Sequence, residues 1–318
     1  MLLAKKSKTQ DIMSISIPPD EVILTKAYKL VVDKEIRIVD LVNVILKDPA
    51  ITLKILKTGN QSATLNGQQE TISLSSAITR LGFDSLKSIL FGLQAIKNPK
   101  DNLILKSLNN YRYEAVRISD VSNIIAKYIG NKVKEPSRLG GLFLNIGYIL
   151  LLLNFKEDFL TVEKETSQAL LKYELEKKFN YDVEKITLKY LRRNLIPDNL
   201  VETLNRDAVF TPQEKNLYLI RAITQGAKEL INAFDRDKLN QYKIAGVMPA
   251  KSYLRTLPFT QNEYGLIYNE VIEYLVERKF EKKNLESQAK NSKNNINESN
   301  DNKSENIDSQ NIETQDNN

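Results

Sequence analysis

Hydrophobic residues recur along most of the chain at the three- and four-residue spacing of an amphipathic helix. The first clear stripe consists of Val39, Val42, Ile45 and Leu46. No pattern typical of a strand–helix–strand unit and no Gly-rich phosphate loop interrupts this series. The sequence therefore predicts an all-α fold, with helices at residues 37–46, 49–59, 73–81, 84–93, 113–129, 139–155, 163–179, 182–195, 198–205, 212–234 and 263–280.

Local signals set the expected helix ends in the first hundred residues. Asp48 is a good N-cap, and Pro49 is a good first helical residue. Gly59 can adopt the left-handed conformation that ends a helix, so the polar segment from Asn60 to Glu70 is expected to be a surface loop. Gly82 is expected to end the helix before it in the same way.

The most apolar segment runs from Leu139 to Phe155 and contains 17 consecutive uncharged residues. This length lies at the low edge of what spans a membrane. Gly140, Gly141, Asn145 and Gly147 weaken the membrane interpretation. A helix buried in a large helical core is therefore the preferred interpretation, and a membrane span is the alternative.

Three residue types are absent from the 318 residues: histidine, cysteine and tryptophan. Without histidine and cysteine, the chain cannot form the usual zinc, haem, iron–sulfur or blue-copper sites. Cysteine nucleophiles, Ser-His-Asp triads and disulfides are excluded for the same reason. Oxygen ligation of magnesium by Asp and Glu stays open.

Charge is distributed unevenly along the chain. The formal net charge is +6, but the segment from Asn284 onward holds 3 Lys and 7 acidic residues, so the rest of the chain carries +10. This basic body keeps a nucleic-acid-binding role open, although dispersed lysine usually serves solubility.

The two ends of the chain are expected to lack a packed structure. Residues 281–318 are rich in Asn, Ser, Gln and acidic side chains, which bury too little apolar surface to offset the cost of chain ordering. We expect a disordered tail there and a flexible N-terminus at residues 1–15. The N-terminus also lacks the apolar core of a signal peptide, and the absence of cysteine fits a cytoplasmic protein.

The first block carries an ordered series of short motifs. They are Ile17-Pro18-Pro19, Asp48-Pro49-Ala50, Leu53-Lys54-Ile55-Leu56, Gly59-Asn60, Ile72-Ser73-Leu74, Ala77-Ile78 and Leu81-Gly82. This series resembles the bacterial HDOD family, the HD-related output domain, whose members show Pro-Pro or Leu-Pro before a helix, then "Asp-Pro-Ala-Leu", "Leu-Leu-x-x-Ala-Asn-Ser" and "Ile-x-Ser-Ile-x-x-Ala-Ile-x-x-Leu-Gly".

The second block continues the resemblance. The segment 141–147 looks like the family's "Gly-Leu-Leu-His-Asp-Ile-Gly", and 179–183 with 195–197 is similar to its "Phe-Gly-x-Asp-His" and "Trp-x-Leu-Pro". The resemblance covers about Ser16 to Leu275. It implies one domain at residues 16–280, with an N-terminal helical lobe at 16–102 and a lobe at 103–280 shaped like a metal-dependent HD phosphohydrolase.

The chain departs from the HD pattern where the resemblance implies metal ligands. Catalytic HD enzymes use His and Asp to hold metal ions that activate water. Leu144-Asn145 stands where the His-Asp pair would be, while Tyr113 and Val183 lie about where other histidines would be. Leucine and valine cannot bind a metal, so we expect no catalytic metal, no cofactor and no enzyme activity.

Several polar residues are weighed as interaction sites, each against a plain structural role. Asn145 is either a ligand contact in the former metal pocket or a buried amide satisfied by nearby backbone. Lys189, Arg192 and Arg193 share a helix face, which suits either a phosphate or nucleic-acid patch or, more simply, a solvated surface. Asn60 and Gln61, in the expected surface loop, are the other candidates for recognition.

Two short acidic segments are interpreted as turns or helix caps. They are Asn205-Arg206-Asp207 and Asp235-Arg236-Asp237, and each contains a cation that would oppose metal binding.

Three functions remain in order of preference. The first is a non-catalytic signalling or scaffold protein, as the HDOD resemblance implies. It would bind a protein partner, or a nucleotide second messenger, in the cleft between the lobes. The second is a basic helical protein that binds nucleic acid. The third is a residual metal-dependent phosphohydrolase, which no residue pattern favours.

Overall fold

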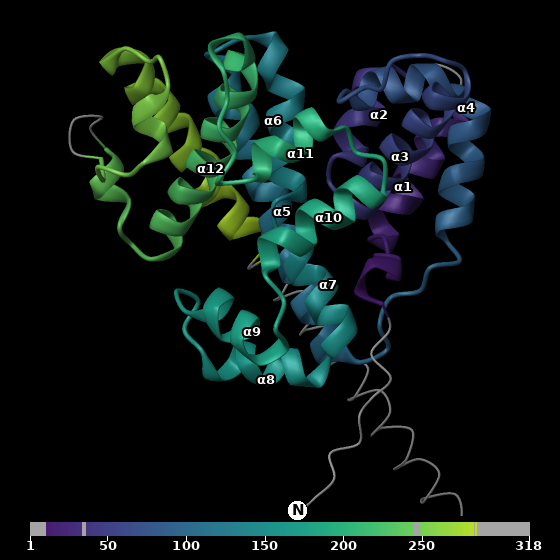
Figure 1. Cartoon of the computed structure of the whole chain (residues 1–318), viewed down its shortest axis with the longest axis horizontal. Helices are drawn as coiled ribbons and strands as arrows, with labels where there is room; N and C mark the ends of the chain where they lie inside the picture. The colour runs from purple at the N-terminus through teal and green to yellow at the C-terminus, as the bar shows by residue number, and fades with distance from the viewer. Residues whose placement is uncertain (1–10, 34–35, 244–247, 283, 285–318) are drawn as a thin grey trace, which may run out of the picture. The chain divides into compact units, whose positions relative to one another are not determined.

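The structure is a computed structural model that describes residues 11–33, 36–243, 248–282 and 284. Over these residues the chain is helical and contains no strand, which confirms the all-α prediction (Figure 1). The expected disordered tail lies almost wholly outside the described residues.

The first lobe contains a short 3₁₀ helix and four α-helices. Helix α1 contacts α2 and α4, and α3 packs along α4. Gly82 interrupts α4 with φ 73° and ψ 164°, which confirms the predicted break at this glycine. The elements are η1 (Ile12–Ser14), α1 (Glu21–Val32), α2 (Ile38–Ile45), α3 (Pro49–Leu65) and α4 (Leu74–Leu93).

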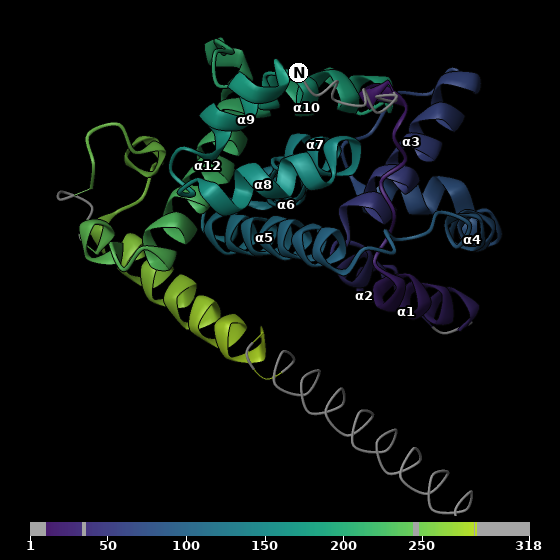
Figure 2. The ribbon, with the colours of Figure 1, turned by 90° about the horizontal axis from the view of Figure 1, so that it is seen from below.

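The second lobe is built on a long helix, α5, which packs against α6 and α12 (Figures 1 and 2). Helix α7 contacts both α5 and α10, and α11 packs on α12. The elements are α5 (Asn102–Lys127), α6 (Asn131–Phe143), α7 (Ile146–Phe155), α8 (Glu157–Glu165), α9 (Leu171–Phe179), α10 (Val183–Arg193), α11 (Asp198–Leu204), η2 (Pro212–Glu214), α12 (Lys215–Asp235), η3 (Leu239–Tyr242) and η5 (Tyr253–Thr256).

A last helix spans residues 261–282. It extends two residues past the expected end of the domain. The helix begins in the compact unit that ends at Tyr268 and continues into a second unit that begins at Asn269.

The predicted helix end at Gly59 is wrong. Helix α3 continues through Gly59 to Leu65, and the connection to α4 occupies only residues 66–73. A Cβ atom on Gly59 would lie 2.9 Å from the Cβ of Ala77 in α4. The glycine therefore serves the close approach of two helices, and sequence alone could not distinguish this role from a helix stop.

Other predicted boundaries also differ from the structure. Helix α5 begins eleven residues earlier than expected, because the Asp101 side chain caps its first turn through the N–H groups of Leu103 and Ile104. The expected helices at 139–155 and 163–179 are each divided in two. At the N-terminus, Ile12 and Met13 are buried, so residues 11–15 belong to the packed structure rather than to a flexible end.

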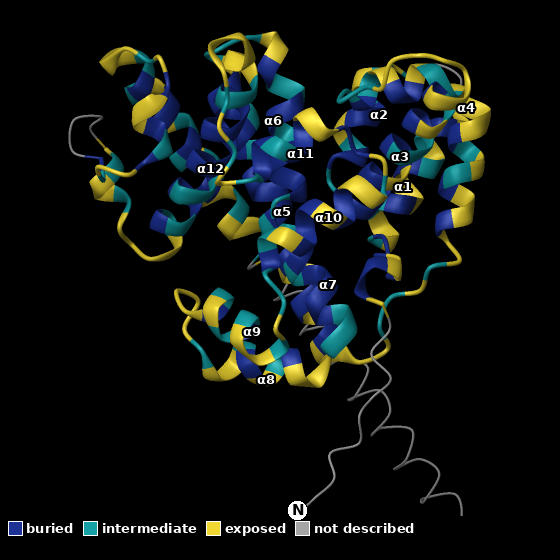
Figure 3. Ribbon diagram, viewed as in Figure 1, coloured by how far each residue is buried: buried dark blue, intermediate teal, exposed yellow. Residues whose placement is uncertain are grey.

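The apolar segment is part of the protein core. Within the described residues one helical stretch, Asn131–Phe155, is long and apolar enough to cross a membrane, but 67% of its most apolar window is buried inside the protein. Figure 3 shows most of α7 as buried. The chain also turns at Leu144–Asn145, between α6 and α7. These features fit the preferred prediction of a core helix.

A buried carboxylate joins the two lobes. Asp48 has 0% exposure and accepts the N–H groups of Asp20 (2.8 Å) and Ile51 (2.7 Å). The Arg112 guanidinium of α5 lies 3.9 Å away and donates to the Pro18 carbonyl (2.6 Å). Burial raises the pKa of Asp48, although Arg112 and both backbone donors oppose this shift.

We predict that Asp48→Ala lowers the free energy of unfolding by about 3–5 kcal/mol, because it leaves the buried Arg112 without its carboxylate. Urea unfolding followed by circular dichroism measures this loss. Asp84→Ala removes a fully exposed carboxylate of α4 and is the matched control, with an expected change within about 0.5 kcal/mol. Equal losses in the two variants would contradict the role assigned to Asp48.

Candidate functional site

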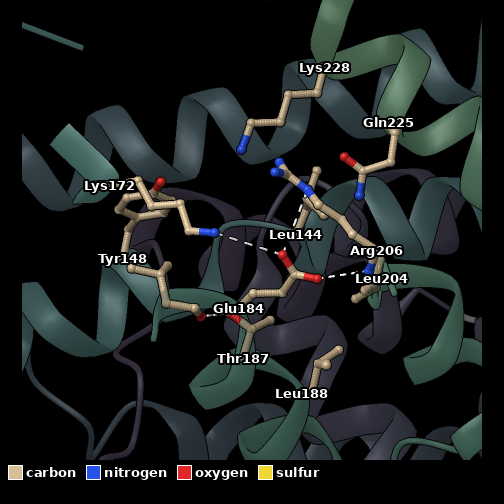
Figure 4. A pocket seen from close by; sticks show the side chains of 11 residues that line it. Leu144, Tyr148, Lys172, Glu184, Thr187, Leu188, Leu204, Arg206, Gln225 and Lys228 are labelled. Atoms are coloured by element: carbon tan, nitrogen blue, oxygen red, sulfur yellow. Dashed lines mark hydrogen bonds and ion pairs between the residues drawn. The ribbon is translucent and has the colours of Figure 1, made fainter. Parts of the chain in front are cut away.

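A pocket opens in the second lobe between the α6–α7 junction and helices α9, α10, α11 and α12 (Figure 4). It encloses about 390 Å³, part of it open to solvent, and water reaches about 30 Å³ of this space. That is room for about two water molecules. The lining residues are Leu144, Tyr148, Lys172, Val183, Glu184, Thr187, Leu188, Leu204, Arg206, Gln225 and Lys228.

Glycine sets the distance between two walls of the pocket. The Gly147 N–H in α7 donates to Thr187 Oγ1 in α10 at 2.9 Å. A Cβ atom on Gly147 would lie 2.3 Å from the Val183 carbonyl oxygen, which no side chain could accommodate without moving a helix. Thr187 also donates to that carbonyl at 2.8 Å, so one hydroxyl ties the start of α7 to the first turn of α10.

The floor of the pocket contains an ammonium group held by an amide. Lys228 Nζ in α12 donates to Asn145 Oδ1 at 2.9 Å and lies 5.8 Å from the centre of the Tyr148 ring. Asn145 is 1% exposed, and its Nδ2 has no hydrogen-bond partner among the described residues. Asn145 is therefore not a buried amide satisfied by nearby backbone, because its oxygen faces a cation.

The wall opposite Lys228 carries an ion-pair network. Glu184 accepts the Arg206 backbone N–H at 2.8 Å, and its carboxylate lies 3.6 Å from Arg206 Nε and 3.9 Å from Lys172 Nζ (Figure 4). Glu176, just outside the lining, lies 3.6 Å from Lys172. The described lining thus contains three cations and one carboxylate.

Burial and neighbouring charge both act on Lys228. Burial lowers its pKa, and the positive charges of Arg206 and Lys172 lower it further. The carboxylates of Glu114 and Glu184 act in the opposite direction and do not overcome these effects.

A second polar side chain in the pocket is incompletely satisfied. Gln225 is 3% exposed, and its Nε2 finds no hydrogen-bond partner among the described residues. Figure 4 shows this amide extending from α12 into the pocket, one helical turn from Lys228. A buried donor without an acceptor is costly, so this amide calls for an acceptor.

Comparison with known proteins identifies the family. The family model of the HDOD domain matches residues 17–208, which is more than half of the chain. The chain belongs to the HDOD family. No curated protein matches the sequence.

The chain is also similar to solved structures. A fragment of the MmoQ response regulator from Methylococcus capsulatus is 16% identical, with a TM-score of 0.58 over 79% of this chain and 94% of that chain. An HDOD domain protein of unknown function from Geobacter sulfurreducens is 15% identical, with a TM-score of 0.42 over 83% of this chain and 91% of that chain. At this identity the MmoQ match shows a shared fold.

The residues expected at the former HD metal site are only partly brought together. Leu144 and Val183 line the same pocket, and Asn145 reaches it through Lys228. Tyr113 does not line this pocket. It is half-buried on α5, and the Arg117 guanidinium lies 5.5 Å from its ring centre.

The proposed recognition loop is not where the sequence placed it. Asn60 is fully buried in α3, with Nδ2 donating to the Thr71 and Leu195 carbonyls and Oδ1 accepting the Thr71 N–H. It is a structural bridge between the α3–α4 connection and the segment after α10, so the prediction of a surface position for Asn60 is wrong. Gln61 is exposed, but on a helix.

The basic face of α10 is largely neutralised within the protein. Arg192 lies 2.7 Å from Asp198 and also pairs with Glu202, and Arg193 lies 3.4 Å from Asp11. Lys189 is exposed. Nucleic-acid binding through this face stays a prediction.

The two acidic segments mostly have the expected turn and cap roles. Asp235 ends α12 and forms two hydrogen bonds with Arg117, at 2.8 and 2.9 Å, and Asp237 has φ 53°. Asn205 Oδ1 accepts the Asp207 N–H at 3.1 Å. Arg206 departs from the prediction, because its side chain enters the pocket.

Sequence reasoning missed the cations that define the pocket, namely Lys172, Arg206 and Lys228, together with Gln225. Gln225 and Lys228 lie three residues apart in an amphipathic helix, where Gln225 is buried. Such a polar pair normally indicates a solvated face. Only the packing of α9, α10 and the α6–α7 junction over it turns that face into a pocket.

The lowered pKa of Lys228 predicts that the free energy of unfolding depends on pH. Between the folded pKa and the unfolded value of 10.5, the unfolded state binds more protons, so rising pH stabilises the native protein. Lys228→Met removes this effect. We expect the unfolding free energy of the variant minus that of the original protein to shrink as the pH rises toward 10.5.

Urea unfolding at several pH values measures this difference. Tyrosines of the unfolded chain ionise near the top of this range in both proteins, so their contribution cancels in the difference. Lys189→Met, which removes an exposed charge of α10, is the control, and its difference from the original protein is expected to stay constant. A constant difference for Lys228→Met as well would contradict the lowered pKa.

Proposed function

We propose that this HDOD protein is a non-catalytic signalling domain that acts in the cytoplasm by binding a protein partner. The observation that carries the proposal is the content of the former metal pocket. Leu144 and Val183 supply apolar carbons where the HD pattern has ligands, and the Lys228 ammonium is bonded to Asn145.

Charge supports the absence of metal chemistry in this pocket. A divalent cation there would meet Lys172, Arg206 and Lys228, with Glu184 as the carboxylate of the lining. Hard cations bind where several oxygen ligands gather, and like charges at this range repel. No cluster of three or more Asp or Glu side chains suited to a metal occurs within the described parts of the chain.

The fold and the family support a role in binding. MmoQ, which shares the fold, is a response regulator, and this chain carries the HDOD domain over residues 17–208. We propose that the chain receives or relays a signal through contact with another protein. It would act as a scaffold that binds this partner through its surface and catalyses no reaction.

We predict that the purified protein does not hydrolyse phosphodiesters. The assay uses bis-p-nitrophenyl phosphate and a cyclic dinucleotide with added Mn²⁺ or Mg²⁺, after metal analysis of the protein. An active HD phosphodiesterase in the same buffers is the positive control. The rate is expected to equal that of buffer alone, because the described residues include no cluster of acidic side chains that would hold a metal ion and its activated water. Robust turnover that a chelator abolishes would overturn the proposal.

We expect the binding role to appear in affinity purification from the native cell, followed by mass spectrometry. The full chain and a chain ending at residue 282 are compared, with an unrelated basic protein of similar size as the control bait. One protein recovered in near-stoichiometric amount with the full chain, and then shown to bind it after separate purification, supports the proposal. Recovery of no such protein contradicts it.

A further inference from the structure

We propose that the pocket around Lys228 binds a terminal phosphate group, either on a small phosphorylated molecule or as the free ion, and that this ligand is the input of the signalling domain. The inference rests on the proposed function, since an active hydrolase would consume such a ligand. It assigns to the former metal pocket an anion in place of a cation.

The first argument is the state of the Lys228 ammonium. Its hydrogen bond in the structure goes to the neutral Asn145 carbonyl oxygen, at 2.9 Å. Glu184, the carboxylate of the lining, is held by Lys172 and Arg206 on the other wall. A half-buried ammonium whose hydrogen bond goes to a neutral oxygen is unfavourable. The carboxylates of Glu114 and Glu184 favour its charge but do not offset its burial, and an incoming anion would add negative charge beside it.

The second argument is the Gln225 amide. Gln225 is almost fully buried, lines the pocket and has no partner for Nε2 among the described residues. An N–H group can be satisfied only by an acceptor. Lys228 lies one turn further along the same face of α12, so an oxygen-rich group in the pocket would receive hydrogen bonds from both residues.

The third argument selects phosphate among anions. The Arg206 and Lys172 side chains are 50% and 38% exposed, so they form a rim that can move. Together with Gln225 and Lys228 they offer more donors than the two oxygens of a carboxylate can use. A phosphate monoester has three terminal oxygens and about two negative charges, and an arginine guanidinium binds such oxygens in pairs.

The size of the pocket limits how much of the ligand enters. The water-accessible space of about 30 Å³ is small, so the terminal oxygens of a phosphate group are expected to enter it and a nucleoside to stay outside the rim. A monoester is therefore expected to bind better than a cyclic diester, whose phosphate is flanked by carbon on two sides. Glu184 competes with the ligand for Lys172 and Arg206, so its carboxylate is expected to weaken binding.

The test is calorimetric titration of the full chain at constant ionic strength with inorganic phosphate, adenosine monophosphate and cyclic adenosine monophosphate. Saturable one-to-one binding of either of the first two supports the proposal. Tighter binding of phosphate than of the nucleotide identifies the free ion as the ligand, and the reverse order identifies a phosphorylated molecule. Binding of the cyclic diester as tight as that of the monoester overturns the choice of a terminal phosphate.

Three variants locate the binding. Lys228→Met is expected to weaken affinity about tenfold or more, the loss of one charged hydrogen bond. Lys189→Met removes an exposed lysine of α10 outside the pocket, and its affinity should stay within about twofold of the original. Glu184→Gln is expected to strengthen binding severalfold. If circular dichroism shows that Lys228→Met does not fold, the affinity of Glu184→Gln is the result that tests whether the ligand binds in this pocket.

The outcomes separate this inference from the proposed function. No saturable binding of phosphate or of the monoester, or equal binding by Lys228→Met and the original protein, overturns the anion pocket and leaves a non-catalytic protein. Unchanged or weaker binding by Glu184→Gln also overturns it. Release of phosphate from the monoester during the titration overturns the proposed function instead.

Discussion

The fold depends on one buried carboxylate, that of Asp48. It caps α3 through Ile51, holds the start of α1 through the Asp20 N–H, and faces Arg112 from the first turns of α5. Arg112 in turn binds the Pro18 carbonyl and Asn98, so the approach to α1 and the connection between α4 and α5 meet at the same point. Because each group would be a costly uncompensated charge without the other, the lobes cannot separate here without exposing both. This constraint explains why the short motif Asp48-Pro49-Ala50 stands at the centre of the first lobe.

The pocket depends on a second constraint, the close approach of helices at glycine. Gly147 lets α7 lie against α10, and Gly141 lets α6 lie against α5, where a Cβ atom would meet the Ser119 backbone at 2.8 Å. These contacts bring Leu144 and Val183 to one pocket although 39 positions separate them in the chain. The packing that shapes this pocket therefore uses glycines and apolar side chains rather than its charged lining residues.

Helical periodicity was sufficient to predict the fold class, and the motif order was sufficient to predict the family, because both depend on local spacing. The structural role of individual glycines could not be predicted from the sequence. Gly82 is a true break with positive φ, whereas Gly59 sits inside α3 to admit Ala77, and the two are indistinguishable without the partner helix. Because the helix was predicted to end at Gly59, Asn60 was predicted to lie in a surface loop, whereas it is buried in α3. For the pocket, the positions of Leu144 and Val183 could be predicted from the motif. The new cations could not, because Lys172, Arg206 and Lys228 come from three distant segments that only tertiary packing brings together.

The positive charge of the pocket comes from lysine and arginine side chains. In the HD pattern a carboxylate at the position matching Asn145 meets a metal ion, and here the Asn145 amide oxygen meets the Lys228 ammonium. The amide is the neutral counterpart of the carboxylate, so it still accepts a hydrogen bond but no longer balances a full charge. The negative charge of Glu184 compensates Lys172 and Arg206 at the rim of the pocket, because its carboxylate is paired with them rather than with Lys228. The carboxylates that favour the charge of Lys228, Glu114 and Glu184, do not offset the cost of burying it. Shifted titration of this kind clusters at functional sites, which is the physical reason to look for the function of this protein in this pocket.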